Sequence, residues 1–225
     1  MADAPRLRRY RHHASPPRGD RRLRADPFPG FTLPGVETGM EELRRRILES
    51  GRVESDLVIV DSFLNHRTDP VLMSSVGEWL AARLGDFDLV LTAEASGIPA
   101  AYSTAKAAGV DFIYAKKQNR RLDPDLHVIR RVSSPTKGGS TWITIRKELL
   151  GVGRDIVVVD DFLSRGRTAE ALGEMIEESG NRLTGFGFVI EKTFTGGRSL
   201  LETHGWKIES AAIIDSIENN RIVFA

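Results

Sequence analysis

The chain has 225 residues, enough for one α/β domain with a hydrophobic core and a short additional segment. It has no cysteine, which excludes disulfides, thiolate metal sites and thiol catalysis, and its 40% hydrophobic content is that of an ordinary globular protein. No apolar run approaches the roughly 18 residues of a membrane helix, and no apolar segment follows the arginine-rich start as a secretory signal requires, so we expect a cytoplasmic protein without a membrane partner.

Residues 1–39 differ in composition from the rest of the chain. They hold eight arginines and four acidic residues, a net charge of +4, together with six prolines and four glycines, and they show no helical or strand period. We expect a flexible extension here, either a solvated tail or a segment upstream of a start at Met40, although a basic arm could touch nucleic acid. Residues 40–225 carry 24 basic and 27 acidic residues, so we expect one domain that does not bind nucleic acid.

Helical and strand patterns alternate from residue 41 onward. Residues 41–49 have a helical pattern, and residues 57–60 form a short apolar run. Asp69 and Pro70 then supply an N-cap and a first-turn proline for a helix that continues to Leu84. Further strands are predicted at 89–93, 112–115, 156–159, 186–190, 208–214 and 222–224, and further helices at 98–108 and 169–179. This alternation predicts an α/β fold with a mainly parallel central sheet flanked by helices, in which ligands bind at the carboxyl ends of the strands.

Residues 156–168 form the most informative stretch of the sequence. Four apolar residues of a buried strand lead into Asp160 and Asp161, and a small polar loop then opens a helix. Unpaired backbone N–H groups at such a helix start suit a phosphate dianion, and a glycine lets the backbone approach it closely. The carboxylates are better placed to accept hydrogen bonds from ribose hydroxyls or to support a magnesium-bound ligand; the alternative is an ordinary turn with solvated acids. The phosphate-binding candidates are Ser164, Arg165, Gly166, Arg167 and Thr168.

This strand, acid pair and loop resemble the phosphoribosyl pyrophosphate (PRPP) motif of type I phosphoribosyltransferases, which implies the fold of that family. Phe162 is larger than the aliphatic residue more usual at its position. In the family, a second strand–loop–helix turn binds pyrophosphate through backbone N–H groups, which implies this role for Ala95, Ser96 and Gly97. The family loop often uses a strained peptide, and a cis peptide at Ala95–Ser96 would be costly, on the order of 3–4 kcal/mol, and would signal function.

A basic, turn-rich stretch begins at Lys116. The resemblance implies that residues of about 116–145 form a flexible hood, which closes over the site and excludes water. Lys116 or Lys117 would then reach the pyrophosphate, whereas the alternative for either side chain is a solvated surface charge.

Three further segments, residues 60–66, 189–194 and 205–210, narrow the resemblance. Together with the PRPP motif they look like bacterial xanthine phosphoribosyltransferases, and the likeness runs from Met40 nearly to the last residue. Within it, Phe162 could stack on the face of the purine. The purine-binding positions that the resemblance implies are Val58, Asn65, Phe162 and Lys192.

The resemblance also implies a reaction, in which xanthine and PRPP give xanthosine monophosphate and pyrophosphate in purine salvage. Magnesium would be held mainly through PRPP, without a direct protein ligand, and Asp160 and Asp161 would be the catalytic residues that hold the ribose and offset its developing positive charge. A homodimer is implied by the resemblance alone. Two alternatives remain open: the same reaction on guanine, hypoxanthine or adenine, and a regulator that senses PRPP, although 39 proline-rich residues cannot build the winged-helix domain usual in such regulators.

Two further polar residues are expected to have structural roles. His66 is expected to order its segment through hydrogen bonds, and Glu191 is expected to be structural rather than a general base. The histidines, at positions 12, 13, 66, 127 and 204, show no metal-ligand spacing.

Overall fold

The computed structural model describes residues 36–54, 57–134 and 139–225. Most of the expected extension, residues 1–35, lies outside the described residues, as do residues 55–56 and 135–138. No helix in the described part of the chain is long and apolar enough to cross a membrane.

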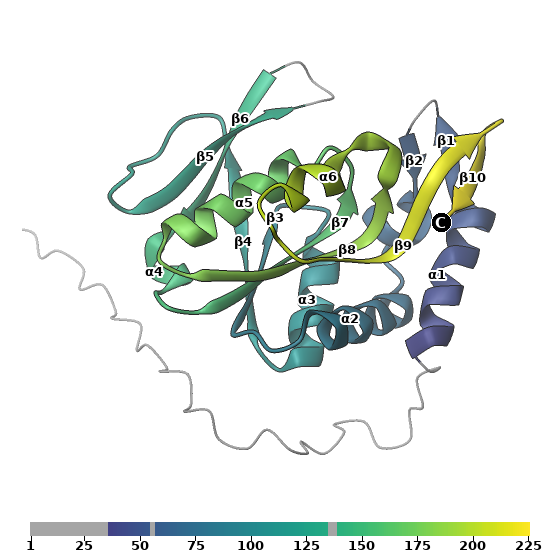
Figure 1. The fold of residues 1–225 in the computed structure, drawn as a ribbon, viewed down its shortest axis with the longest axis horizontal. Helices are drawn as coiled ribbons and strands as arrows, with labels where there is room; N and C mark the ends of the chain where they lie inside the picture. The colour runs from purple at the N-terminus through teal and green to yellow at the C-terminus, as the bar shows by residue number, and fades with distance from the viewer. Residues whose placement is uncertain (1–35, 55–56, 135–138) are drawn as a thin grey trace, which may run out of the picture. The chain divides into compact units, whose positions relative to one another are not determined.

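One sheet of eight strands organises the described residues (Figure 1). Its strands lie in the order β10 (Arg221–Phe224), β9 (Ile208–Glu218), β8 (Arg182–Lys192), β7 (Asp155–Leu163), β3 (Leu89–Ala93), β4 (Asp111–Gln118), β6 (Gly139–Arg146) and β5 (His127–Ser134). The five strands from β9 to β4 run parallel, and β10, β6 and β5 pair antiparallel at the two sides. The predicted mainly parallel α/β sheet is confirmed.

Helices cover both faces of this sheet. In Figure 1, α2 (Pro70–Leu84) and α3 (Ile98–Ala108) lie on one side of it, and α5 (Arg167–Glu178) and α6 (Gly197–Glu202) lie on the other. Alternate residues of β7 serve the two cores: Val157 and Val159 belong to the apolar cluster of α2 and α3, whereas Ile156 and Val158 belong to the cluster of α5. A strand that is buried on both faces has a continuous apolar run, which explains the sequence that precedes the acid pair.

Helix α1 (Val36–Ser50) begins four residues ahead of Met40, where the sequence patterns placed the start of the domain. Residues 36–39 are therefore helical rather than part of the extension. Gly39 permits this course, because a Cβ atom at its position would lie only 2.5 Å from Cβ of Ser75 on α2. From its composition, the segment that contains Gly39 was assigned to the flexible extension. The close approach of α1 to α2 instead requires a glycine at this position.

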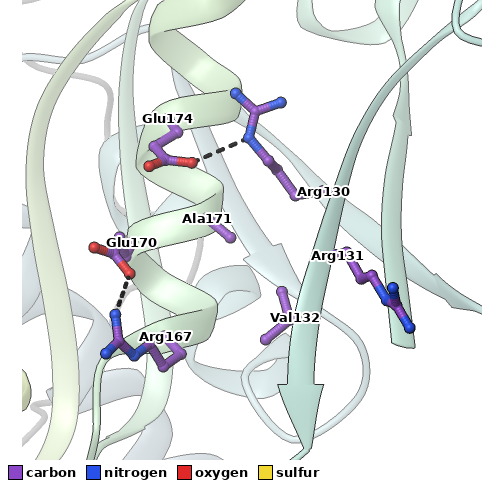
Figure 2. Close-up of a pocket in the computed structure, with 7 residues that line it drawn as sticks. All are labelled: Arg130, Arg131, Val132, Arg167, Glu170, Ala171 and Glu174. Atoms are coloured by element: carbon purple, nitrogen blue, oxygen red, sulfur yellow. Dashed lines mark hydrogen bonds and ion pairs between the residues drawn. The ribbon is translucent and has the colours of Figure 1, made fainter. Parts of the chain in front are cut away.

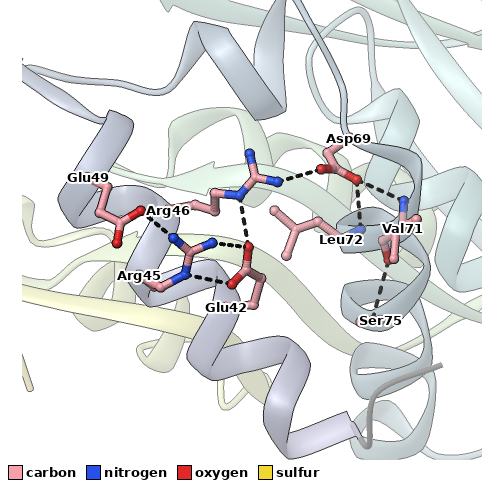
Figure 3. Close-up of polar contacts among 8 residues, drawn as sticks. All are labelled: Glu42, Arg45, Arg46, Glu49, Asp69, Val71, Leu72 and Ser75. Atoms are coloured by element: carbon pink, nitrogen blue, oxygen red, sulfur yellow. Dashed lines mark hydrogen bonds and ion pairs between the residues drawn. The ribbon is translucent and has the colours of Figure 1, made fainter.

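The predicted cap of α2 is confirmed, and it also anchors α1 (Figure 3). Oδ1 of Asp69 accepts hydrogen bonds from the backbone N–H groups of Val71 at 3.0 Å and Leu72 at 3.2 Å. Its other carboxylate oxygen lies 2.8 Å from the guanidinium of Arg46 on α1. Asp69 therefore accepts from backbone N–H groups at the start of α2 and also holds α1 in place through Arg46.

Residues 116–140 were expected to be turn-rich, but residues 127–134 form strand β5, which pairs with β6 at 139–146, so that part of the prediction was wrong. The residues of β6 explain the difference, because the β-branched side chains of Thr141, Ile143 and Ile145 alternate along it, and Ile143 and Ile145 are buried. The remaining elements are β1 (Arg52–Glu54), β2 (Leu57–Ile59), the π-helical turn η1 (Asp61–Asn65), α4 (Lys147–Leu150) and the short turn η2 (Thr193–Thr195).

Candidate active site

The loop after β3 lies directly against the acidic end of β7. These strands are parallel neighbours, so their carboxyl ends meet at the same edge of the sheet. A Cβ atom on Gly97 would lie 2.2 Å from Oδ1 of Asp160 and 2.3 Å from Oγ1 of Thr92. Because no side chain fits in that space, the backbone of the loop approaches Asp160 as closely as glycine allows.

Asp160 and Asp161 form a connected pair at the end of β7. The backbone N–H of Asp161 donates to Oδ1 of Asp160 at 2.9 Å, and the hydroxyl of Ser96 donates to Oδ1 of Asp161 at 3.0 Å. Burial of its carboxyl group, reinforced by the negative charge of Asp161, raises the pKa of Asp160 well above its usual value. The pair therefore favours ligands that donate hydrogen bonds or carry positive charge.

The predicted phosphate loop joins β7 to α5. Gly166 has a φ of +73°, in the left-handed region, and stands immediately before the first helical residue, Arg167. The loop rests on the start of α6: a Cβ atom on Gly197 would lie 2.0 Å from the carbonyl oxygen of Ser164. Backbone N–H groups at the start of α5 thus stand beside the acidic pair, the arrangement that an anionic ligand with a polar sugar requires.

The side chain of Arg167 extends from the start of α5 toward Glu170 (Figure 2). It donates to Glu170 at 3.1 Å and lines a cavity of about 360 Å³ between α5 and β5. Arg130 of β5 lines the same cavity and bonds Glu174 of α5 at 3.0 Å. The acidic pair does not line this cavity, whereas the side chain of Arg167 does.

The two lysines of the predicted hood occupy consecutive positions on β4, so their side chains point to opposite faces. The positive charge of Lys117 acts on Asp160, where it opposes the rise in pKa. The backbone N–H of Lys117 also donates to Oε1 of Glu94 at 2.5 Å, a contact that sequence reasoning missed. The peptide between Glu94 and Ala95 is cis, one residue before the Ala95–Ser96 peptide considered from the sequence.

The predicted purine-binding residues come from three elements. Lys192 ends β8 and is 7% exposed, with Nζ 6.0 Å from the ring centroid of Phe194. Phe162, on the neighbouring strand β7, is partly buried. It packs against the apolar cluster to which Val58 of β2 belongs. Asn65 closes η1, and its Oδ1 atom is buried without a hydrogen-bond partner in the structure. A buried acceptor without a partner is costly, so it marks a position that a ligand can satisfy.

The residue before Lys192 forms an ion pair through a buried carboxylate. Glu191 is fully buried, and its two oxygens accept from the guanidinium of Arg198 at 2.6 Å each. The hydroxyl of Ser210 donates to the same carboxylate at 2.5 Å. Sequence reasoning did not find Arg198, although an acid within an apolar strand is itself a signal that a partner must exist.

His66 is largely exposed, with Nδ1 3.7 Å from Oδ2 of Asp61 at the other end of η1. This long contact is consistent with a role in ordering the turn.

Comparison with known proteins places the chain in a family. It is 43% identical over 185 residues to the xanthine phosphoribosyltransferase of Chloroflexus aurantiacus, covering 80% of this chain and 86% of that protein. It is 40% identical over 189 residues to the xanthine phosphoribosyltransferase of Ectopseudomonas mendocina, covering 82% of this chain and 99% of that one. The chain belongs to the xanthine phosphoribosyltransferase family.

Solved structures confirm the type I phosphoribosyltransferase fold. The adenine phosphoribosyltransferase of Thermoanaerobacter pseudethanolicus superposes with a TM-score of 0.64 at 25% identity, over 77% of this chain and 98% of that chain. The enzyme of Saccharomyces cerevisiae, complexed with adenine and an imino-altritol bisphosphate, gives a TM-score of 0.65 at 22% identity, over 78% and 99% of the two chains. No protein-family model matches the chain. This chain thus shares its fold with enzymes named for adenine, whereas its relatives in sequence are named for xanthine.

Proposed function

We propose that this protein transfers the 5-phosphoribosyl group of PRPP to xanthine, giving xanthosine monophosphate and pyrophosphate, as a cytoplasmic enzyme of purine salvage. The observation that carries the proposal is the junction of Asp160 and Asp161 with the loop at the start of α5 and with Gly97 of the preceding loop. Hydrogen-bond acceptors for a sugar thereby stand between two sets of backbone N–H groups suited to phosphate.

Each part of PRPP has a place in this arrangement. The 5-phosphate would bind the loop from Ser164 to Thr168, whose N–H groups and hydroxyls are donors. The pyrophosphate would bind the backbone of residues 95–97, with Lys117 as its cationic partner, because the charge of Lys117 acts on the same acidic pair. The ribose hydroxyls would then face Asp160 and Asp161, which accept their hydrogen bonds.

The proposed reaction breaks the bond from C1′ to pyrophosphate and forms a bond from C1′ to a purine ring nitrogen, which releases its proton to the departing pyrophosphate or to solvent. As the leaving group departs, the ribose gains positive charge, which the two aspartates stabilise electrostatically. No residue needs to form a covalent intermediate, because positioning both substrates supplies most of the acceleration. The loops contribute by holding PRPP at both of its phosphate-bearing ends.

Magnesium is the proposed cofactor. Among the described residues, no group of three or more His, Asp or Glu side chains could hold a metal ion. We propose that the ion is held mainly through PRPP. The oxygen-only chemistry of Asp160 and Asp161 suits this ion, either through water or through the ribose hydroxyls. When bound, magnesium would neutralise charge on the pyrophosphate leaving group.

The base pocket is proposed to lie between β8, β7 and η1. The ammonium group of Lys192 offers only donors, which suits the carbonyl oxygens of xanthine, and Oδ1 of Asn65 is a buried acceptor that a ring N–H could satisfy. Phe162 and Val58 would provide the apolar surface for the purine face. A C6 amino group would instead meet a cation, so adenine is the base that this pocket rejects most strongly.

The extent of the catalytic domain and the assembly are also proposals. We propose that residues 40–225, together with the first turn of α1 from Val36, form the catalytic domain, and that residues before α1 are not needed for the reaction. Membership of the family supports a homodimer as the working form.

A direct assay tests the proposed function. Purified protein is incubated with xanthine, magnesium and PRPP carrying a label in the ribose, and the products are separated. We expect labelled xanthosine monophosphate and an equal amount of pyrophosphate. Binding of PRPP without any nucleotide product from xanthine, guanine, hypoxanthine or adenine would refute an enzymatic function and favour a sensor.

A further inference from the structure

The turn between β8 and α6 is closed by a buried ion pair. Nε of Arg198 donates to Oε1 of Glu191 and a terminal nitrogen donates to Oε2, each at 2.6 Å, so the pair is bidentate. The carboxylate is fully buried and also accepts from Ser210 of β9 at 2.5 Å. A bidentate pair is strong and also restricts the relative orientation of its two groups. It therefore keeps the side chains of Glu191 and Arg198 at a constant distance from each other.

Lys192, the proposed purine-binding residue, lies inside this closed turn. Its backbone carbonyl accepts from the hydroxyl of Thr195 at 2.7 Å. Gly196 then reverses the chain with a φ of +78°, a conformation that favours glycine. The backbone that carries Lys192 is therefore fixed by the turn rather than by the strand alone.

The other end of the turn supports the phosphate loop. A Cβ atom on Gly197 would lie 2.0 Å from the carbonyl oxygen of Ser164, and one on Gly166 would lie 3.0 Å from the carbonyl oxygen of Gly197. The backbones of the turn and of the phosphate loop are thus in direct contact. A shift at the start of α6 must move the loop, because no side chain separates them to absorb it.

We propose that the Glu191–Arg198 pair is a positioning clasp, which holds the purine-binding Lys192 and the phosphate loop at a fixed distance from each other. This inference rests on the proposed function, which assigns the base to Lys192 and the 5-phosphate to the loop. The ring nitrogen of the base must meet C1′ of the sugar, and a misplacement of about 1 Å can lower a rate ~100-fold. Arg198 acts through these two elements and touches neither substrate.

The test is the variant Arg198→Met, which keeps much of the apolar stem and removes the guanidinium. We expect the KM values for PRPP and for xanthine to rise together, and kcat/KM for each to fall ~10- to 100-fold. A merely structural role would lower the folded fraction, and hence the maximal rate, but leave both KM values of the folded molecules unchanged. Unchanged KM values would therefore overturn the proposal.

Arg182→Met is the matched control. Arg182 also forms a bidentate pair, with Asp155 at 2.8 and 2.6 Å, but at the start of β8, far along the strand from Lys192. We expect both of its KM values to match those of the wild type. Equal increases in the two methionine variants would show a general effect of losing an arginine and would overturn the clasp.

A second variant covers the case in which Arg198→Met does not fold because Glu191 is left charged and buried. The double variant Glu191→Gln with Arg198→Gln removes both charges, and we expect it to fold with raised KM values. Arg198→Lys keeps the charge but not the bidentate geometry, so we expect KM values between those of the wild type and of Arg198→Met.

The affinity for magnesium-PRPP is measured by calorimetry in parallel. Weaker binding only in the position-198 variants supports the clasp whichever base reacts, and unchanged affinity overturns it. A wild-type protein that binds PRPP but does not use xanthine would refute only the proposed base.

Discussion

The hydroxyl of Ser96 donates a hydrogen bond to Oδ1 of Asp161 at 3.0 Å and thereby joins the loop after β3 to the acidic pair that ends β7. The two loops are separated by more than sixty residues in the sequence. Because Asp161 is buried and Ser96 is exposed, the bond orients a carboxylate from the solvent side. We assigned the loop that carries Ser96 to pyrophosphate and the acid pair to ribose. The hydrogen bond therefore connects the protein groups that would bind two neighbouring parts of PRPP.

Ser96→Ala should therefore weaken catalysis more than stability. Loss of a hydrogen bond to a charged group is worth about 1.5–3 kcal/mol, so kcat/KM for PRPP should fall roughly tenfold or more. Ser216→Ala is the control, because Ser216 also donates to a carboxylate, Glu218 at 3.2 Å, on β9, the strand next to the edge strand β10. Steady-state kinetics check both variants; equal kcat/KM values would contradict the assignment of Ser96.

Gly97→Ala should damage the site directly. Its Cβ atom would lie 2.2 Å from Oδ1 of Asp160, so either the carboxylate or the loop must move. We expect PRPP affinity, measured by calorimetry, to fall at least tenfold, since about 1.4 kcal/mol already suffices for that change. Gly185→Ala on β8 is the control, because its nearest neighbour is the flexible tip of Leu84 at 3.2 Å. A Gly97→Ala protein that binds PRPP normally would show that the loop does not contact the ligand.

Asp161→Asn should lower turnover far more than it lowers the free energy of unfolding. The carboxylate charge is proposed to act mainly on the positive charge of the transition state, whereas the amide keeps the size of the side chain. Asp160→Asn should behave similarly in turnover. The measurement is kcat at saturating PRPP, xanthine and magnesium beside denaturant unfolding. Near-normal rates in both variants would refute the role of the acid pair.

The stability of the ligand-free protein should depend on pH through Asp160. Its raised pKa means that the folded protein keeps a proton where the unfolded chain has lost it. This contribution is fully present below the ordinary aspartate pKa of about 3.9 and is lost as the pH rises through the raised value. The free energy of unfolding of the wild type, relative to Asp160→Asn, should therefore decline across that window. Denaturant unfolding at a series of pH values measures this difference in free energy of unfolding between the wild type and Asp160→Asn. A difference that does not change with pH would contradict the raised pKa of Asp160.

The sequence predicted the parts of the site that follow local rules. A buried strand, two acids and a glycine loop stand together in residues 156–168, and Asp69 before Pro70 marks a helix start; each pattern has a local physical cause. The contact of Gly197 with Ser164 has no such local signal, because it joins two separate turns through tertiary packing.

The strands of the hood were missed for a different reason. Lysines, arginines, prolines and glycines between residues 116 and 140 suggested turns, and they outweighed the alternating β-branched residues of β6. The position of the cis peptide, Glu94–Ala95, likewise could not be derived from residue types, since neither residue is a proline.

The choice of base is the central claim, and our proposal assigns its chemistry chiefly to Lys192. This residue is 7% exposed at the carboxyl end of β8, and it offers only donors to a ligand. Loss of one charged hydrogen bond is worth about 1.5–3 kcal/mol, so Lys192→Ala should lower kcat/KM for xanthine tenfold or more while PRPP affinity barely changes. Lys147→Ala, on the exposed helix α4, is the matched control and should leave both unchanged.

The most direct test is competition among xanthine, guanine, hypoxanthine and adenine for one limiting pool of PRPP, with the nucleotide products quantified for the wild type and for Lys192→Ala. Xanthine should have the highest kcat/KM, guanine and hypoxanthine lower values, and adenine almost none, because its C6 amino group would face the lysine cation. The Lys192→Ala variant should lose most of the preference for xanthine. A wild-type preference for adenine, or a variant that discriminates as the wild type does, would contradict the proposed pocket.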